Sequence, residues 1–140
     1  MDQQQIFGPF FGVMLLTIVV WLWMYAKRIP FINSLDLEPN QITPAELAKR
    51  SPPSVSNPSD NLRNLFEVPV LFYAAVLYVF VTATVDQVYL VAAWAYFVLR
   101  VLHSAIHCTI NIVMMRFVIY VLSCACVFFM IVRAALSHFV

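Results

Sequence analysis

Charged side chains are scarce in this sequence of 140 residues. Asp, Glu, Lys and Arg make up 11% of the chain, against about 25% in ordinary globular proteins, and 63% of the residues are hydrophobic. A small soluble domain needs more polar surface than this to cover itself. The length is typical of one domain, because domains usually hold ~100–200 residues. The composition therefore argues against a soluble enzyme, a disordered tail or a fibrous repeat, and it indicates an integral membrane protein.

Three other features are missing as well. The net charge is only +1, which is not typical of a nucleic-acid-binding protein. Cys108, Cys124 and Cys126 form no CxxC pair and no zinc spacing, and their odd number argues against a disulfide framework, so no metal site is predicted. The N-terminus carries Asp2 instead of a basic region, and no cleavage site follows the first apolar stretch. That stretch is therefore interpreted as an uncleaved membrane span.

Long apolar runs are what the sequence does contain. Each is close to the ~20 residues that a helix needs to cross the hydrocarbon core of a membrane. The four predicted spans cover about residues 6–26, 65–85, 87–109 and 114–135. The last three are joined by short links, which force neighbouring helices to run antiparallel. The sequence thus predicts a single all-α membrane domain over residues 1–140, with an up-down bundle of four transmembrane helices.

The segment 27–62 differs from the rest, since it holds six of the 8 prolines and most of the charge. A Thr-Pro-Ala-Glu motif at 43–46 has an N-cap, a proline at the first helical position and a capping-box Glu. It predicts one short helix that ends near Arg50. The remainder is expected to be an extended surface loop, and Ser59 or Asp60 is expected to cap the second long helix.

The distribution of basic residues predicts the orientation in the membrane. The first loop and its flanks hold Lys27, Arg28, Lys49, Arg50 and Arg63. The N-terminus and the link between the second and third spans hold no Lys or Arg. Because cytoplasmic loops carry an excess of Lys and Arg, we expect loop 27–62 to be cytoplasmic and both termini to lie outside.

Polar residues at helical spacing occur on three of the predicted spans. They are Asp60, Arg63, Asn64 and Glu67 on the second, Arg100, His103, Ser104, His107 and Asn111 on the third, and Arg116, Tyr120 and Ser123 on the fourth. A charge that faces lipid at the centre of a helix costs about 2.5–3.5 kcal/mol on insertion scales. Taken one at a time, snorkelling explains Arg63 and Arg116, and local partners explain Glu67 and the histidines. Arg100 lies too deep to snorkel easily and needs a polar partner or water. Antiparallel topology puts all three sets in the same half of the membrane, which favours one polar cavity open toward the cytoplasm.

Several of these residues also carry a family resemblance. An Arg-Asn pair at 63–64 is followed by a Glu three positions after the Asn and by Pro69. This pattern resembles the signature of the MAPEG superfamily, the membrane-associated proteins in eicosanoid and glutathione metabolism, and in particular its small bacterial members. Arg100 and His103 look like the Arg-x-x-His pattern of that family, and Arg116 and Tyr120 resemble an Arg and a Tyr on its fourth helix.

The resemblance implies a homotrimer that binds glutathione as a co-substrate between subunits and acts as a transferase, peroxidase or isomerase on lipophilic electrophiles. For a bacterial chain it also implies the inner (cell) membrane. Glutathione carries two carboxylates, which arginines bind in bidentate fashion, and an ammonium group, which an acid accepts. The candidate glutathione-binding residues are Arg63, Asn64, Glu67, Arg100, His103 and His107. Arg116 and Tyr120 are the candidate catalytic residues, because a neighbouring cation stabilises a thiolate.

Some positions depart from the family pattern. His107 stands where some relatives have a tyrosine, and Phe117 follows Arg116 where the prostaglandin-synthase branch has a serine, which disfavours the isomerase activity. Either Lys27 or Arg28 matches the basic residue that binds glutathione at the end of the first helix. A second hypothesis is therefore a non-catalytic MAPEG-fold membrane protein that binds another anionic metabolite or a lipid. A proton or ion path along the third span is a third, less favoured hypothesis.

Overall fold

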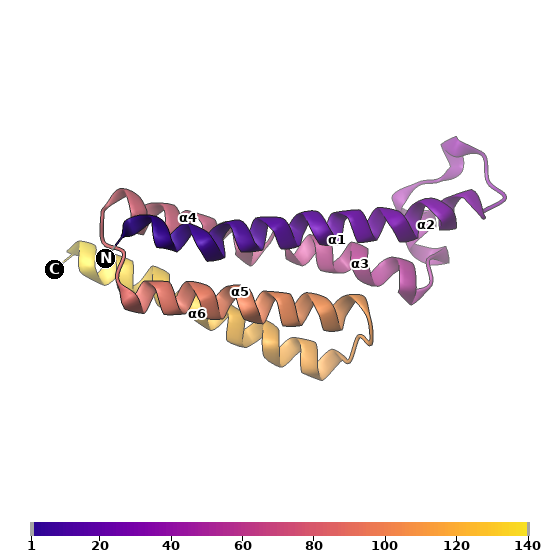
Figure 1. Cartoon of the computed structure of the whole chain (residues 1–140). Coiled ribbons are helices and arrows are strands. Elements are labelled where there is room, and N and C mark those ends of the chain that lie inside the picture. The colour runs from indigo at the N-terminus through magenta and orange to yellow at the C-terminus, as the bar shows by residue number, and fades with distance from the viewer. Residues whose placement is uncertain (1, 140) are drawn as a thin grey trace.

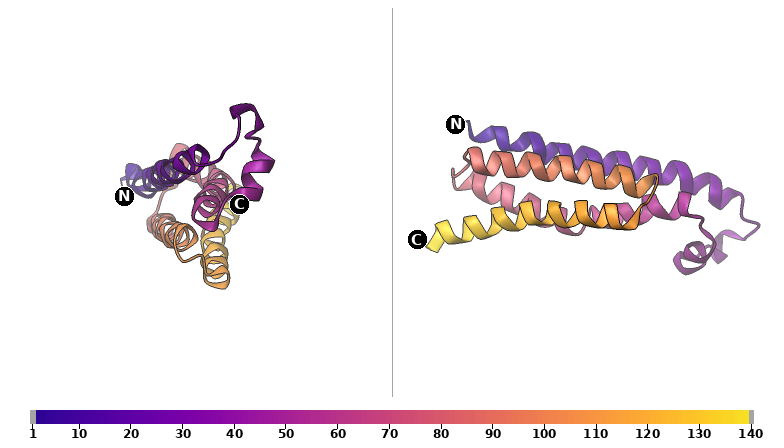
Figure 2. Two further views of the ribbon diagram at one scale, coloured as in Figure 1. Left: turned by 90° about the vertical axis from the view of Figure 1, so that its right-hand side faces the viewer. Right: turned by 90° about the horizontal axis from the view of Figure 1, so that it is seen from below.

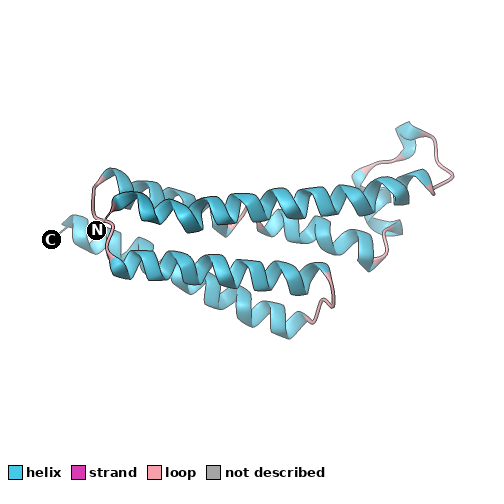
Figure 3. Ribbon diagram, viewed as in Figure 1, coloured by secondary structure: helices cyan, strands magenta, loops and turns pink. Residues whose placement is uncertain are grey.

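The computed structural model describes residues 2–139, and every element of regular structure in that range is helical (Figure 1, Figure 3). The α-helices are α1 (Phe7–Asn33), α2 (Pro44–Arg50), α3 (Pro53–Asn64), α4 (Val68–Val81), α5 (Gln87–Cys108) and α6 (Val113–Phe139). Two short 3-10 helices, η1 (Gln3–Ile6) and η2 (Pro39–Gln41), complete the set. The prediction of an all-α fold is confirmed.

Four helical stretches are long and apolar enough to cross a membrane. They are Gln3–Asn33, Pro53–Val81, Gln87–Cys108 and Val113–Phe139. Large apolar side chains such as Leu15 on α1 and Val81 at the end of α4 lie on the outside, 60% and 79% exposed. A continuous outer surface of this kind requires lipid around it. The chain is a multi-pass integral membrane protein, as its composition predicted.

The helices pack lengthwise around an apolar core. α5 and α6 form an antiparallel hairpin, α1 lies along α3 and α5, and α4 packs against α6 (Figure 2). All four long helical stretches contribute fully buried side chains to the core, for example Val13, Phe72, Tyr96 and Val127. α1 approaches α5 closely at Gly12, where an added Cβ would lie 2.8 Å from the ring of Phe97.

Both termini lie at one end of the bundle together with the turn between α4 and α5, and we call this the terminal end (Figure 1). The Gln3 side chain holds the turn there, because its Nε2 donates to the Val85 carbonyl at 3.2 Å and its Oε1 accepts from the Val85 N–H at 2.9 Å. Arg133 of α6 donates from Nη1 to Oδ1 of Asp86 at 2.8 Å and from Nη2 to Oδ2, and its guanidinium lies 4.3 Å from the centroid of the Tyr89 ring. Hydrogen bonding to Arg133 lowers the pKa of the Asp86 carboxyl to about 2.

The opposite end, which we call the loop end, holds the segment between α1 and α3 and the turn between α5 and α6 (Figure 1). The predicted short helix is present there as α2. The Thr43 hydroxyl accepts from the Glu46 N–H at 3.2 Å, Pro44 occupies the first turn, and the helix ends at Arg50. Arg50 bonds the Glu46 carboxylate at 2.6 Å and lowers its pKa. α1 reaches Asn33, beyond the predicted end of its span at residue 26.

The expectation of an extended loop up to residue 62 is wrong. The residues from Pro53 to Asn64 form helix α3, whose N-cap is Pro52, so that Ser59 and Asp60 lie inside this helix instead of capping the next one. Proline at the start of a helix is tolerated because the first N–H groups have no helical partner. Burial of Val55 and the packing of Leu62 and Leu65 beside Val20 of α1 stabilise the helix.

The second predicted span is divided by a break between α3 and α4. α3 ends at Asn64, and Glu67 precedes α4 with φ −93° and ψ −100°, which are not helical angles. Pro69 explains the break, because its ring displaces the carbonyl four residues earlier and it has no N–H to donate. The carbonyls of Asn61, Leu62 and Arg63 still accept from the N–H groups of Leu65 and Phe66, whereas the break leaves the Asn64 carbonyl without a backbone donor.

Candidate functional site

A buried polar cluster lies toward the loop end, between α3, α5 and the first turns of α6. Its most buried members are on α5, where Arg100, His103, Ser104 and His107 are between 0% and 3% exposed. Of the residues that were predicted to share a cavity, the α5 set, Asn64, Asn111, Arg116 and Tyr120 lie together. The periodicity of α5 alone places its four polar side chains on one face.

Arg100 is the deepest charge in the protein, with 0% of its surface exposed. Its Nη2 donates to the backbone carbonyl of Asn64 at 3.0 Å, and its Cζ lies 5.5 Å from the centroid of the Tyr120 ring. The carbonyl is available because α3 ends at Asn64, so the break before Pro69 creates the acceptor. Among residues 2–139, the Nε and Nη1 of Arg100 have no hydrogen-bond partner.

Arg116 is held by asparagines at the turn between α5 and α6. Its Nη1 donates to Oδ1 of Asn111 at 2.6 Å, and Nδ2 of Asn111 donates to Oδ1 of Asn57 at 2.9 Å. Asn111 has φ 48°, a left-handed conformation that asparagine adopts more readily than most residues. The turn thereby ties the start of α6 to α3 and aims the guanidinium of Arg116.

His103 bonds to the backbone of the same arginine. Its Nδ1 lies 3.0 Å from the Arg116 carbonyl oxygen. The His103 ring is 5.6 Å from the ring of Tyr120 and 5.5 Å from that of His107, centroid to centroid. Within the described part of the chain, Nε2 of His103 and Nδ1 of His107 are buried without a partner. The two histidines do not form a metal site with a third His, Cys, Asp or Glu among residues 2–139.

Two asparagines that the sequence analysis did not single out support the cluster from α3. Asn61 is fully buried, donates to Sγ of Cys108 at 3.4 Å and accepts from the Ser104 hydroxyl at 3.4 Å. Asn57 contacts Asn111 as described above. Asn57, Asn61 and Asn64 are spaced i, i+4 and i+7. This spacing can be recognised as one face of a helix only when residues 53–64 are known to be helical.

The cluster opens to the surface through a pocket of about 310 Å³. It is lined by Asn64, His103, Val113, Arg116, Phe117 and Tyr120. The exposed side chains of Phe117 and Val113 make the outer part of its lining apolar. Polar groups form the inner part of this pocket and apolar side chains lie toward its rim, an arrangement suited to an amphiphilic or two-part ligand.

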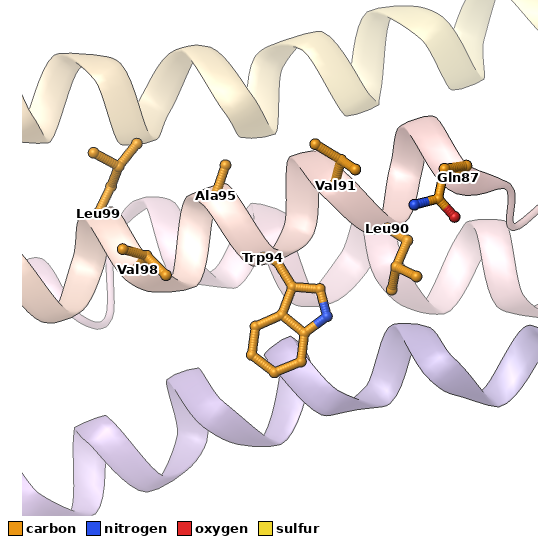
Figure 4. A pocket seen from close by; sticks show the side chains of 7 residues that line it. All are labelled: Gln87, Leu90, Val91, Trp94, Ala95, Val98 and Leu99. Carbon is orange, nitrogen blue, oxygen red and sulfur yellow. The ribbon is translucent and has the colours of Figure 1, made fainter.

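A different pocket, of about 580 Å³, lies on the outer face of α5 nearer the terminal end (Figure 4). It is lined by Gln87, Leu90, Val91, Trp94, Ala95, Val98 and Leu99. Trp94 points toward α1, where an added Cβ on Gly8 would lie 2.9 Å from its ring. Because this lining carries no titratable group, the pocket offers a packing surface instead of a chemical site.

Two of the predicted binding residues lie outside the cluster within one chain. Arg63 is exposed and lies 3.9 Å from the carboxylate of Asp60, both on α3. It lines a small pocket of about 100 Å³ to which Arg28 also contributes. Glu67 is exposed at the break between α3 and α4. Ser123, predicted with the third set, is buried and donates to the Tyr120 carbonyl at 2.7 Å.

The charged groups of the cluster are all positive. Arg100 and Arg116 carry two positive charges, and neither forms a salt bridge with a carboxylate in the described part of the chain. The exposed Glu67 lies close enough to Tyr120 to interact electrostatically but does not enter the cluster. Arg100 is buried and Arg116 is half-buried, and a buried cation requires an anionic partner or water. The arrangement therefore favours a ligand that carries negative charge.

The fold and this cluster define a small four-span membrane protein with a buried cationic site near one end. A family model described as the MAPEG family matches residues 6–136, which is nearly the whole chain. The chain belongs to the MAPEG family. That family includes glutathione transferases and peroxidases as well as other members. Comparison with curated proteins and with solved structures finds no match.

Proposed function

We propose that this protein is a glutathione-dependent membrane transferase or peroxidase that acts on lipophilic electrophiles. The observation that carries the proposal is the buried, uncompensated charge of Arg100 beside the pocket that Arg116 lines. Glutathione brings two carboxylates to such a site, and bidentate contacts with arginine are among the strongest hydrogen bonds in proteins. The Nε and Nη1 of Arg100 have no acceptor among residues 2–139, and in this proposal a glutathione carboxylate supplies one.

Arg116 is assigned to the thiol. Its guanidinium is fixed by Asn111, and the residue lines the same pocket as Tyr120. A cation or a hydrogen-bond donor next to a thiol favours the thiolate, which is the nucleophile. In this proposal the thiolate attacks the electrophilic centre, and Arg116 with the Tyr120 hydroxyl stabilises the negative charge on sulfur.

The exposed residues Arg63 and Glu67 are proposed to act in an oligomer. We propose a homotrimer in which the surface that carries Arg63 and Glu67 faces the pocket of a neighbouring subunit. Glu67 would then accept hydrogen bonds from the ammonium group of glutathione, while Arg63 and either Lys27 or Arg28 would contact a carboxylate. This explains why these side chains stay exposed in a single chain although their residue types fit the ligand.

The second substrate is proposed to enter from the membrane. Phe117 and Val113, which line the pocket, are 57% and 59% exposed, so the approach from the bilayer is apolar. A lipophilic electrophile concentrates in the hydrocarbon phase by partition, and a lateral opening places it next to the thiolate. Glutathione would enter from the loop end, which is proposed to face the cytoplasm.

Calorimetry with glutathione and the full chain in lipid nanodiscs tests the proposal. Glutathione is expected to bind and to show thiolate absorbance in the ultraviolet, and Arg116→Ala is expected to remove that absorbance. Glu67→Ala is expected to weaken binding. Arg50→Ala is the matched control, because Arg50 pairs with Glu46 on the surface at 2.6 Å. Absence of glutathione binding by the unaltered protein would refute the proposal.

The alternative is a non-catalytic MAPEG-fold protein that binds another anionic metabolite or a lipid. The observation that favours it is the pair of histidines, together with Phe117 beside Arg116, which makes the ligand-facing set differ from that of some relatives. Its chemistry needs only an anionic group at the two arginines. A competition experiment distinguishes the two hypotheses. If the alternative holds, inorganic phosphate or phosphatidylglycerol binds in place of glutathione, and no thiolate forms.

A further inference from the structure

The hydrogen bond between His103 and the backbone settles which ring nitrogen carries a proton. A carbonyl oxygen only accepts, so the Nδ1 that lies 3.0 Å from the Arg116 carbonyl carries the hydrogen. In the neutral ring Nε2 is then an acceptor with a free lone pair. This Nε2 is buried and has no partner among residues 2–139, and His103 lines the pocket with Arg116 and Tyr120.

The groups that face His103 favour the neutral ring. Arg100 and His107 face it from α5, Arg116 and Tyr120 from α6, and Asn64 from the end of α3. None of these is a carboxylate, and two are permanent cations. A third positive charge is therefore disfavoured in the absence of ligand. When an anion binds at the arginines, this repulsion is partly cancelled, and a proton on Nε2 becomes acceptable.

From this geometry we infer that His103 is the general base that takes the proton from the glutathione thiol. The inference rests on the proposed function. In the step, the S–H bond breaks, the proton moves to Nε2 of His103, and the electron pair stays on sulfur beside Arg116. With an activated alkene, sulfur then forms a bond to the β-carbon, and the imidazolium returns its proton to the α-carbon. The product keeps all atoms of both substrates, and His103 is neutral again.

Arg116 thereby serves the reaction with two different groups. Its backbone carbonyl orients His103, and its guanidinium, aimed by Asn111, stabilises the sulfur anion. A base that is oriented by a third group and placed next to the nucleophile is the common arrangement in nucleophilic catalysis. Because the group that orients His103 is a backbone carbonyl, no pattern of residue types in the sequence predicts this contact.

The test is His103→Asn in the full chain in nanodiscs, with glutathione as the probe. The asparagine amide replaces the Nδ1–H that bonds the Arg116 carbonyl, and the substitution removes the basic Nε2 together with the ring contacts to Tyr120 and His107. His138→Asn is the matched control, since His138 lies at the terminal end with Tyr78 at 3.3 Å. In the unaltered protein, thiolate formation is expected to release well under one proton to solvent. In His103→Asn, turnover with an alkene acceptor is expected to fall about 100-fold, in the range of general-base catalysis.

The proton count distinguishes a base from a structural residue. Any thiolate that His103→Asn still forms must release a full proton to solvent, and the limb of the pH profile that depends on a neutral imidazole must disappear. His103→Ala, with turnover restored by added imidazole, supports the role independently of the asparagine variant. An unchanged pH profile with one proton released in both proteins overturns it. Failure of the unaltered protein to bind glutathione overturns the proposed function itself, and this role with it.

Discussion

Replacement of Arg100 by methionine tests whether the cluster is a ligand site or a structural brace. Arg100 is 0% exposed, makes one hydrogen bond through Nη2, and leaves Nε and Nη1 unpaired among residues 2–139. A residue that serves only the fold is expected to have its charge compensated within the fold. A residue that serves a ligand leaves that compensation to the ligand, at a cost to the free protein.

The magnitude follows from the contacts. Burial of a charge carries an effective penalty of several kcal/mol, and each buried donor without an acceptor adds about 1–3 kcal/mol. Against this, methionine loses a charged hydrogen bond worth about 1.5–3 kcal/mol and leaves the Asn64 carbonyl unpaired, at a similar cost. It also loses the contact with the Tyr120 ring. We expect Arg100→Met to stabilise the ligand-free protein by about 1–3 kcal/mol, since apolar replacements of buried ionic groups are often stabilising.

Function is expected to change in the opposite direction. Removal of a buried partner of a carboxylate costs about 2–5 kcal/mol of binding free energy, so the Kd for glutathione should rise about 30-fold or more. Arg133→Met is the matched control, because Arg133 forms an ion pair with Asp86 and packs on the Tyr89 ring. This control should lower the free energy of unfolding and leave glutathione binding unchanged.

Equilibrium unfolding of the full chain in mixed micelles, followed by tryptophan fluorescence, measures the stability of each variant. Calorimetry with glutathione measures the affinity. If Arg100→Met unfolds more readily than the unaltered protein, as Arg133→Met is expected to do, Arg100 is a structural residue. The inference that its free donors await an anion would then be refuted.

Three further predictions concern other parts of the molecule. The Asp86 carboxyl has a pKa of about 2 when folded against 3.8 as its ordinary value, so its contribution to stability is present above about pH 4 and lost as the pH falls toward 2. Asp86→Asn should abolish this pH dependence in acid titrations of unfolding and lower stability by about 1 kcal/mol, a small effect because the side chain is 42% exposed and solvent screens the pair. Asn111→Gly keeps the backbone at φ 48° but releases Arg116 and Asn57, so thiol ionisation should weaken and stability should fall by about 0.5–1.5 kcal/mol for each lost hydrogen bond. Asn111→Ala should lose in addition about 1–2 kcal/mol of unfolding free energy from the left-handed conformation, and equal stability of the two variants would contradict this account. Gly12→Ala places a Cβ 2.8 Å from the Phe97 ring and should cost about 1–3 kcal/mol in the same unfolding assay, whereas an unchanged midpoint would show that the ring moves aside freely.

Much of the fold depends on local properties that a sequence displays. The length and hydropathy of the apolar runs predict four spanning helices, since each run must satisfy its own backbone in lipid. The short helix α2 is equally local, because its Thr43 cap, Pro44 and capping-box Glu46 lie within one turn. Short links between the last three spans predict their antiparallel order.

Local reasoning fails for the segment before α4. The prolines at 52, 53 and 58 favour an extended chain, yet residues 53–64 are helical. The deciding contribution is tertiary, because Val55, Leu62 and Leu65 are buried or partly buried as α3 packs along α1. A propensity is a weak preference, and burial of a few apolar side chains overrides it.

The site divides in the same way. Helical spacing places Arg100, His103 and His107 on one face of α5. The sequence by itself determines this shared face and the number of spans. Spacing does not show how α5 is rotated against α3 and α6, or where α3 ends. The partners of Arg100 and His103 are backbone carbonyls, of Asn64 and Arg116, and every residue has such a carbonyl. Only the tertiary structure decides which carbonyl lies close enough to accept from each side chain, and therefore which donors and acceptors remain for a ligand.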